Sequence, residues 1–327
     1  MGALLEIRDM NVRFATPDGE VAAVSEFSCD FSAGECVGIV GESGAGKSQA
    51  FLAVMGLLAP NAQATGTAHF AGVNLLGGSA STLRNVRGSQ LGMIFQDPMT
   101  SLTPHLKIGD QIAEPLVEHK GMDWRSARQR ALELLERVHV TDAAGRLSQY
   151  PHELSGGMRQ RVMIAIALAC NPAMLIADEP TTALDVTIQA QILTLLAELK
   201  REQGMAMALI THDLGVVAGL ADKVVVMYGG RMVESGPVGQ LLTTPRHPYT
   251  QALLDSMPRI DDALDRPLTT IRGQPPNPRR LPSGCAFHPR CDFASRRCAE
   301  QRPPLEQGAV NRVACHHPLR AVAGCAS

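Results

Sequence analysis

A glycine-rich octapeptide that begins at residue 41 constrains the fold of this chain more than any other feature. It follows a short apolar run with β-branched residues, Cys36–Val40, and precedes Gln49–Leu58, where apolar residues have helical spacing. Strand, loop and helix in this order are the context that the G-x-x-x-x-G-K-[ST] motif requires. The matching residues are Gly41, Glu42, Ser43, Gly44, Ala45, Gly46, Lys47 and Ser48. The sequence therefore predicts a phosphate-binding loop between a strand and a helix.

The residue types in this loop suit phosphate for physical reasons. Glycines let backbone N–H groups turn inward around phosphate oxygens, and the helix N-terminus adds its positive dipole end. We expect Lys47 to reach the β- and γ-phosphates and Ser48 to ligate Mg²⁺. An ordinary glycine turn is the alternative, which the flanking strand and helix disfavour. A dinucleotide-binding fold is disfavoured because the loop lacks the G-x-G-x-x-G spacing.

A pair of carboxylates at the end of a second apolar run decides which phosphate chemistry is expected. Met174–Ala177 reads as a strand, and Asp178 and Glu179 follow it directly. A strand end beside the phosphate loop is where a metal-binding aspartate belongs, so we assign Asp178 to Mg²⁺. Glu179 can polarise a water for attack on the γ-phosphate. An acidic helix cap is the alternative interpretation.

The rest of the chain divides into regions of different pattern. Residues 4–31 alternate apolar and polar side chains around a turn signal, which predicts antiparallel strands, and Asp123–Val138 has the composition of an amphipathic helix. From Ala173 onward strands and helices alternate, which indicates a parallel sheet covered by helices. After about Ser256 the chain becomes rich in Pro, Arg and Cys. The further strands expected are 91–95, 207–210 and 224–227, and the further helices are 187–203 and 213–220.

Composition limits what these elements can belong to. With 327 residues, 45% hydrophobic and 19% charged, the chain reads as globular, with one domain plus an appendage or two domains. The formal charge of −2 gives no indication of a nucleic-acid partner. The longest apolar run, Val162–Cys170, is far short of the roughly 18 residues of a membrane span. Since residues 1–10 also lack the features of a signal peptide, a cytoplasmic protein is expected.

Several motifs in fixed order resemble those of the ABC ATPase family. Leu154–Gln160 resembles the family's signature sequence, and Gln96 matches the glutamine that senses the γ-phosphate and Mg²⁺. Ala183-Leu184-Asp185 matches the loop that crosses the dimer interface, and His212 matches the histidine that contacts the γ-phosphate. Phe14 lies where the family stacks an aromatic ring on adenine. The resemblance further implies that ATP on a partner subunit's phosphate loop is capped by Ser155, Gly156 and Gly157.

The C-terminal part narrows the resemblance to the oligopeptide and dipeptide importer ATPases, most closely the oligopeptide subunit lettered D. It rests on residues 94–102, 247–254, 273–277 and 281–315. The resemblance implies a heterodimer with a homologous second ATPase, two transmembrane permease subunits and an extracytoplasmic peptide-binding protein. It also implies peripheral attachment to the cytoplasmic face of a bacterial-type inner membrane. A nickel importer, a soluble ABC ATPase and a regulatory module that uses ATP as a switch are the alternatives.

The cysteines form two groups. Cys29, Cys36 and Cys170 lie singly in apolar surroundings and read as small buried hydrophobes. The others lie near the C-terminus. Because a reducing compartment makes disulfides there improbable, these cysteines suggest a metal site, and Cys₄ coordination suits either a [4Fe–4S] cluster or zinc. Similar importer tails are associated with an iron–sulfur cluster, which favours iron; four thiols without a metal are the alternative. The ligands expected are Cys285, Cys291, Cys298 and Cys315, with Cys325, His288, His316 and His317 as further candidates.

Together these features predict an α/β fold of the P-loop ABC ATPase kind. It would have a RecA-like parallel-sheet core, an N-terminal antiparallel β-layer and a helical subdomain at about 98–170, all within residues 1–255. Residues 256–327 would be a Cys-rich extension. In the mechanism implied by the resemblance, two ATPs are sandwiched between paired subunits. The residues expected to act on the γ-phosphate are Glu179, His212, Lys47 and Gln96.

Overall fold

The computed structural model describes residues 2–182, 184–257, 270–308 and 311–319, and the chain forms two compact units. The first comprises residues 1–5, 31–36 and 70–210. The second comprises residues 6–30, 37–69 and 211–327. Of the residues singled out above, Ala183 and Cys325 lie outside the described part of the chain.

The first unit contains three parallel strands that run side by side. They are β6 (Leu91–Ile94), β7 (Met174–Asp178) and β8 (Ala206–Thr211), with β7 paired to both others. Every residue of these strands is buried. Continuous apolar runs of this kind are typical of strands covered on both faces. The parallel arrangement predicted from the alternating pattern is thus confirmed, and it brings the carboxyl ends of the strands to one edge.

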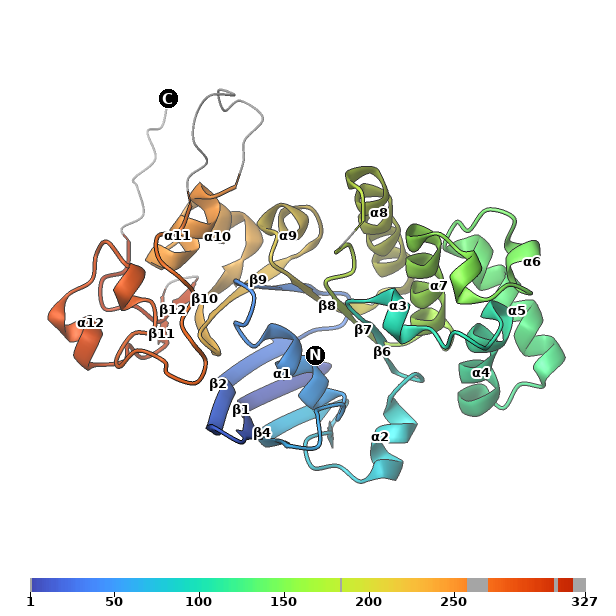
Figure 1. Cartoon of the computed structure of the whole chain (residues 1–327), viewed down its shortest axis with the longest axis horizontal. Helices are drawn as coiled ribbons and strands as arrows, with labels where there is room; N and C mark the ends of the chain where they lie inside the picture. The colour runs from blue at the N-terminus through green and yellow to red at the C-terminus, as the bar shows by residue number, and fades with distance from the viewer. Residues whose placement is uncertain (1, 183, 258–269, 309–310, 320–327) are drawn as a thin grey trace. The chain divides into compact units, whose positions relative to one another are not determined.

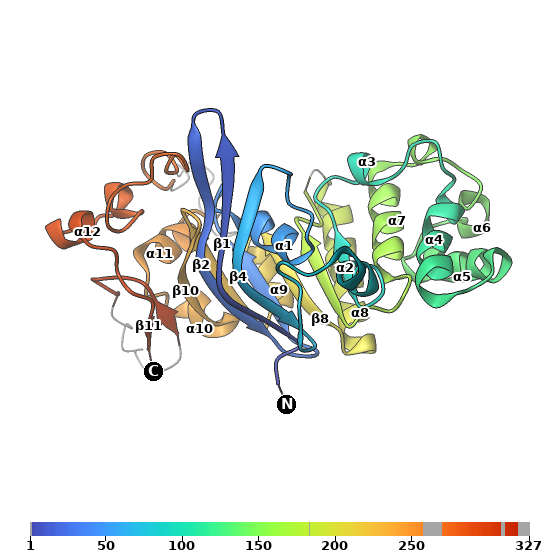
Figure 2. The same ribbon diagram turned by 90° about the horizontal axis from the view of Figure 1, so that it is seen from below.

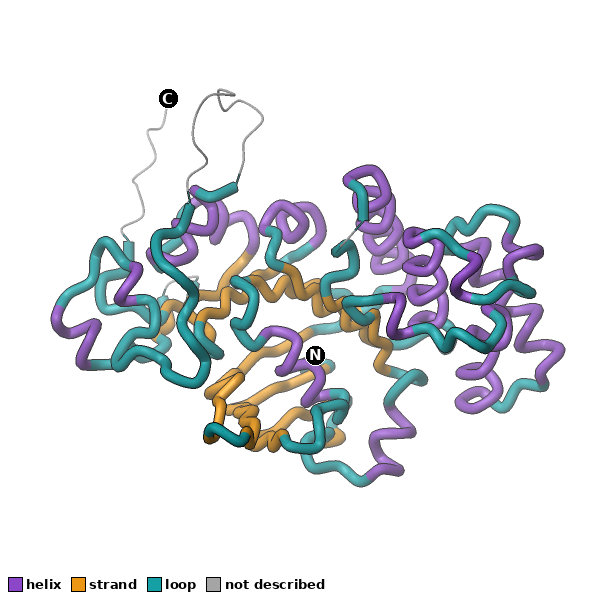
Figure 3. Tube along the Cα trace, viewed as in Figure 1, coloured by secondary structure: helices purple, strands orange, loops and turns teal. Residues whose placement is uncertain are grey.

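Helices make up most of the first unit between β6 and β7 (Figures 1 and 3). Within it, α4, α5 and α7 pack against one another. The side chain of Asp123 accepts hydrogen bonds from the N–H groups of Arg125 and Ser126, so α5 starts there. The helices of this unit are α2 (Ala80–Val86), α3 (Pro98–Ser101), α4 (Ile108–Lys120), α5 (Trp124–Arg137), α6 (Ala143–Arg146), η1 (Pro151–Glu153), α7 (Gly156–Leu168) and α8 (Val186–Gln203). The predicted helical middle of the chain is therefore confirmed.

The second unit begins with a layer of long strands, which lie side by side in Figure 2. Here β1 (Leu5–Thr16) and β2 (Gly19–Phe31) are joined by the turn at Pro17 and Asp18, and β4 (Ala62–Phe70) pairs with β1. Along β1, buried and exposed residues alternate in part, with Leu5, Ile7, Met10 and Val12 in the core. The N-terminal β-layer predicted from alternation is confirmed. A further two-residue strand, β5 (Val73–Asn74), belongs to the first unit.

A second set of strands in this unit carries the C-terminal part of the chain. The strand β3 (Cys36–Val40) is parallel to β9 (Lys223–Tyr228), and β10 (Arg231–Pro237) is antiparallel to β9. The short strands β11 (Glu306–Gln307) and β12 (Arg312–Val313) continue from β10 in antiparallel pairs. The extension is thus joined to the edge of β10. The helices of the unit are α1 (Lys47–Val54), α9 (Leu214–Leu220), α10 (Val238–Thr243), α11 (Pro248–Asp255), η2 (His288–Arg290) and α12 (Arg296–Glu300).

Candidate functional site

Residues 41–46 of the octapeptide form a tight loop between β3 and α1, as predicted, and Lys47 and Ser48 begin α1. Lys47 is only 5% exposed, and its Nζ donates hydrogen bonds to the carbonyl oxygens of Gly41, at 2.7 Å, and Glu42, at 3.1 Å. Gly46 has φ +89°, and a Cβ there would lie 2.1 Å from the carbonyl oxygen of Ala23 in β2. The loop therefore has a defined backbone with a lysine ammonium folded onto it, at the start of a helix. Such a loop is suited to binding phosphate.

Two residues predicted to act on the γ-phosphate meet in the first unit. The Nε2 of Gln96, two residues after β6, donates a hydrogen bond to Oε2 of Glu179 at 3.1 Å. Glu179 follows β7 directly, and its own N–H donates to the carbonyl oxygen of Ile210 in β8 at 2.8 Å. Its backbone has φ +45°, which is unusual for a residue with a side chain. Asp178, the last residue of β7, is 5% exposed.

Thr182, which is not among the residues predicted from the sequence, also contacts Glu179. The Oγ1 of Thr182 donates to Oε2 of Glu179 at 2.8 Å, and the N–H of Thr182 donates to the carbonyl oxygen of Glu179 at 3.2 Å. These bonds close a turn just after the strand. The signal in the sequence was a hydroxyl residue three positions after the carboxylate, with Pro180 between them.

The signature segment begins helix α7 in the first unit. Ser155 is the N-cap, and its side chain accepts a hydrogen bond from the N–H of Met158 at 3.4 Å. Ser155 and Gly156 are exposed, so the start of this helix is accessible. Gln160, one turn further on, is 2% exposed and donates to the carbonyl oxygen of Pro180 at 2.6 Å. This bond ties the signature helix to the turn after Glu179, a link that the sequence did not indicate.

The remaining predicted residues are distributed between the units. Phe14 is half-buried near the end of β1, and His212 is exposed just after β8; both belong to the second unit, as do Lys47 and Ser48. Leu184 and Asp185 belong to the first unit, where the Asp185 side chain caps α8 by accepting from the N–H of Ile188 at 2.9 Å. The roles assigned to these residues stay predictions.

The four C-terminal cysteines gather around one small cavity in the second unit. Cys285, Cys291, Cys298 and Cys315 line it together with Phe287 and the candidates His288, His316 and His317. Burial raises the pKa of the Cys285 and Cys291 thiols, and raises that of Cys315 to about 11. Within the described residues, no three His, Cys, Asp or Glu side chains are arranged so that they could hold a metal ion. The donor set predicted from the sequence is therefore assembled in one place, without the geometry of a formed metal site.

Among the helices in the described part of the chain, none combines the length and apolar character needed to cross a membrane.

Comparisons of the sequence with known proteins point to one family. The ABC transporter family profile matches residues 24–182, and that of the oligopeptide/dipeptide transporter C-terminal region matches residues 233–298. The oligopeptide transport ATP-binding protein OppD of Salmonella typhimurium is 52% identical over 317 residues, which are 97% of this chain and 94% of that protein. OppD of Haemophilus influenzae is 53% identical over 298 residues, covering 91% of this chain and 92% of that one.

Solved structures agree on the fold. A dimeric ATP-binding cassette in a post-hydrolysis state, bound to ADP and Pi, matches with a TM-score of 0.65 and 28% identity, over 72% of this chain and 98% of that one. CbiO1 from Clostridium perfringens, part of an ABC transporter complex, matches with a TM-score of 0.61 and 28% identity. The match covers 74% of this chain and 91% of that one. This chain is therefore an ABC ATPase of α/β fold and belongs to the family of oligopeptide transport ATP-binding proteins.

Proposed function

We propose that this chain hydrolyses ATP to power the import of oligopeptides or dipeptides across the inner membrane. The observation that carries the proposal is the pair of hydrogen bonds from Gln96 and Thr182 to the Glu179 carboxylate. They orient one carboxylate directly after a buried strand, beside the buried Asp178. A general base for water must be held in this way, whereas a module that only binds ATP has no need of one.

The roles in hydrolysis follow from the residues in each unit and from the family. In the second unit, residues 41–48 bind the phosphates, Lys47 and His212 contact the γ-phosphate, and Phe14 stacks on adenine. In the first, Glu179 activates water and Gln96 senses the γ-phosphate. The hydrogen bond to Glu179 uses the Gln96 amide nitrogen, so its oxygen can still ligate a cation. The proposed Mg²⁺ ligands are Ser48, Gln96 and Asp178, oxygen donors of the kind that Mg²⁺ prefers.

The exposed start of α7 supports a role in pairing of subunits. Ser155, Gly156 and Gly157 would cap ATP bound by a partner, because a helix N-terminus with small residues favours phosphate. We propose a heterodimer with a homologous ATPase, two permease subunits and an extracytoplasmic peptide-binding protein. The complex would place this chain at the cytoplasmic face of the membrane. The names of its relatives refer to oligopeptide transport, which supports this cargo over nickel.

We further propose that residues 1–255 form the nucleotide-binding domain, with a helical subdomain at about 98–170, and that residues 256–327 form the extension. The run of helices from α3 to α7 supports the helical subdomain. The match of the C-terminal region to residues 233–298 supports an extension that distinguishes this branch of the family.

The extension is proposed to bind a [4Fe–4S] cluster or zinc through Cys285, Cys291, Cys298 and Cys315. Four sulfurs around one cavity have the right chemistry for either, and a bound metal would cross-link a segment with little core of its own. Iron, sulfide and zinc measured after anaerobic purification would distinguish the two. Cys298→Ser should lose the metal, whereas Cys29→Ser, a change of a buried cysteine in β2, should keep it. Purified protein without iron or zinc would favour the alternative of four thiols.

The cargo is tested on the complete complex in lipid with its binding protein. Peptides should stimulate hydrolysis by the native complex, and Glu179→Gln should abolish that stimulated rate. Stimulation by nickel chelates and not by peptides would retain the ATPase assignment and reject the peptide cargo.

A further inference from the structure

A largely buried ion pair joins the C-terminal extension to the phosphate loop. Arg290, at the end of η2, donates from Nη1 to Oε2 of Glu42 at 2.6 Å and from Nη2 to Oε1 at 3.0 Å. The Arg290 side chain is 5% exposed and that of Glu42 is 23% exposed. Glu42 is the second residue of the loop, 248 positions away in the sequence. Two parallel bonds between a guanidinium and a carboxylate fix direction as well as distance.

The backbone of the same loop residue is held by a second group. The N–H of Glu42 donates to Oη of Tyr249 in α11 at 2.8 Å, and Tyr249 is fully buried. Arg290 also donates to Oη of Tyr228, at 3.2 Å, and to the carbonyl oxygen of Arg272, at 2.8 Å. Burial raises the pKa of Tyr249, so its hydroxyl stays neutral and available. Glu42 is therefore anchored through both its side chain and its main chain.

The aromatic rings around Arg290 form a packed support. The rings of Tyr228 and Tyr249 have centroids 4.5 Å apart, and the ring of Phe287 lies 5.2 Å from the first and 5.3 Å from the second. The guanidinium carbon of Arg290 lies 5.9 Å from the Tyr228 ring centroid and 6.0 Å from that of Phe287. Because packed rings restrict its rotamers, Arg290 presents its guanidinium to Glu42 in one direction.

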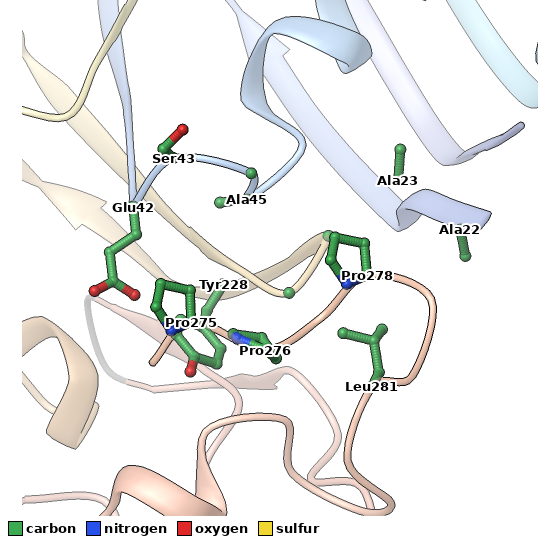
Figure 4. A pocket seen from close by; sticks show the side chains of 13 residues that line it. Ala22, Ala23, Glu42, Ser43, Ala45, Tyr228, Pro275, Pro276, Pro278 and Leu281 are labelled. Atoms are coloured by element: carbon green, nitrogen blue, oxygen red, sulfur yellow. The ribbon is translucent and has the colours of Figure 1, made fainter. Parts of the chain in front are cut away.

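A proline-rich segment of the extension lies along the same side of the loop. Figure 4 shows Pro275, Pro276 and Pro278 across a small cavity from Glu42, Ser43 and Ala45. Prolines have a fixed φ and lose little freedom on folding, so they suit a stiff wall. The extension thus contacts the loop with a rigid surface as well as with a buried charge.

We propose that Arg290 is a positioning residue for ATP: through Glu42 it holds residues 41–48 in the conformation that binds phosphate. Burial of an ion pair is weak support for a stabilising role, because desolvation offsets the attraction. The proposed effect of the Arg290–Glu42 pair is geometric: the pair connects the backbone that would bind phosphate to a separate segment of the chain. The extension therefore sets the ATP affinity of the loop. The inference rests on ATP binding at this loop and does not depend on the cargo.

The test measures equilibrium binding of a fluorescent ATP analogue, and the kcat and KM for ATP, on the assembled complex. Arg290→Met should raise the analogue Kd and the KM about tenfold, with kcat at saturating ATP within about twofold, since a charged hydrogen-bonded pair is lost. Arg290→Lys should recover part of the affinity, because a lysine restores charge without the paired bonds. Lys47→Ala tests whether residues 41–48 bind the nucleotide at all. If the wild type binds the analogue no better than this variant, the assignment of the nucleotide site is wrong.

Two further single variants and one double variant complete the test. Arg302→Met is the matched control, because Arg302 joins the extension through a half-exposed ion pair to Glu26 of β2, which is not a residue of the 41–48 loop. The Kd of this variant should not change. Glu42→Gln should shift Kd as Arg290→Met does, and the double variant should be no worse than either, since the two act as one unit. If Arg290→Met does not fold, Glu42→Gln alone carries the comparison. An unchanged Kd, equal effects of the Arg290 and Arg302 variants, or additive effects would overturn the proposal.

Discussion

The side-chain nitrogen of Gln96 lies 3.1 Å from a carboxylate oxygen of Glu179, although 83 positions separate the two residues. They meet because β6 and β7 are parallel neighbours, so both strand ends reach one edge. Glu179→Gln keeps the shape of the side chain and removes the carboxylate that we propose as the general base. We expect kcat to fall by about 100-fold or more, the usual contribution of a general base. Phosphate release by the complex measures this, and a nucleotide titration should show that binding persists.

Glu136→Gln is the control for this change. Glu136 is exposed on α5, in the same unit, and the substitution alters charge equally. Both rate and binding should stay as in the wild type. Full activity of the Glu179 variant would remove Glu179 from the role of base, and equal losses in both variants would point to charge or folding instead.

Thr182 is expected to support the same carboxylate. Thr182→Val keeps the branched shape and removes the hydroxyl that donates to Glu179 at 2.8 Å. Loss of one hydrogen bond to a charged group should lower kcat by about tenfold and leave KM for ATP unchanged. Thr187→Val, at an exposed position in the first turn of α8, is the matched control. A higher KM with normal kcat would place Thr182 in ATP binding rather than in hydrolysis.

Much of the fold was predictable because its strands are strongly patterned. The buried runs of β3, β7 and β8 were found to within two residues, whereas β4 was missed, since only Ala68 and Phe70 of its residues are buried. The helix after the phosphate loop was predicted to reach residue 58 but ends at 54, because Gly56 takes a left-handed φ of +58°. Helix α4 was not predicted as an element of its own, although it lies in the region expected to be helical; Pro115 lies inside it.

The candidate site, too, could be predicted from the sequence only in part. The residues of the phosphate loop and the acids after β7 are adjacent in sequence, so their motifs could be read directly. The contacts of Gln160 and Arg290 depend on how separate segments pack, and no spacing rule predicts them. The contact of Thr182 is local, since Thr182 lies only three positions after Glu179. The cysteines could be predicted as a group, and they do line one cavity, but their present arrangement is not that of metal ligands.

The glycines of the phosphate loop should differ in how they tolerate a side chain. At Gly46 a Cβ would lie 2.1 Å from the Ala23 carbonyl oxygen, whereas at Gly44, with φ +79°, no heavy atom lies within 4 Å. Gly46→Ala should therefore destabilise the protein by about 2 kcal/mol more than Gly44→Ala, which has only the left-handed strain. Thermal unfolding without nucleotide measures this difference. Equal unfolding temperatures would mean that β2 yields to the added methyl group.

His247 should make the stability of the folded chain depend on pH. It is 1% exposed, its Nδ1 accepts a hydrogen bond from the N–H of Tyr249 at 3.0 Å, and burial lowers its pKa from 6.5 to about 4. Between these values the unfolded chain binds a proton that the folded chain excludes. The contribution of His247 to the free energy of unfolding should therefore be constant above about pH 6.5. It should fall as the pH drops toward 4, by at most about 1.4 kcal/mol per pH unit.

His247→Asn isolates this effect, because asparagine can cap α11 in the same way but does not titrate. Burial raises the pKa of the neighbouring Glu234 above its usual 4.5, which has the opposite effect, since stability then falls as the pH rises past that value. Glu234 accepts from the N–H of His247 at 2.9 Å, a bond that the variant retains, so its contribution is common to both proteins. The unfolding temperature of the variant should lie below that of the wild type at pH 7, and the gap should narrow as the pH approaches 4. A gap that is constant with pH would show that His247 titrates alike in the folded and unfolded chain.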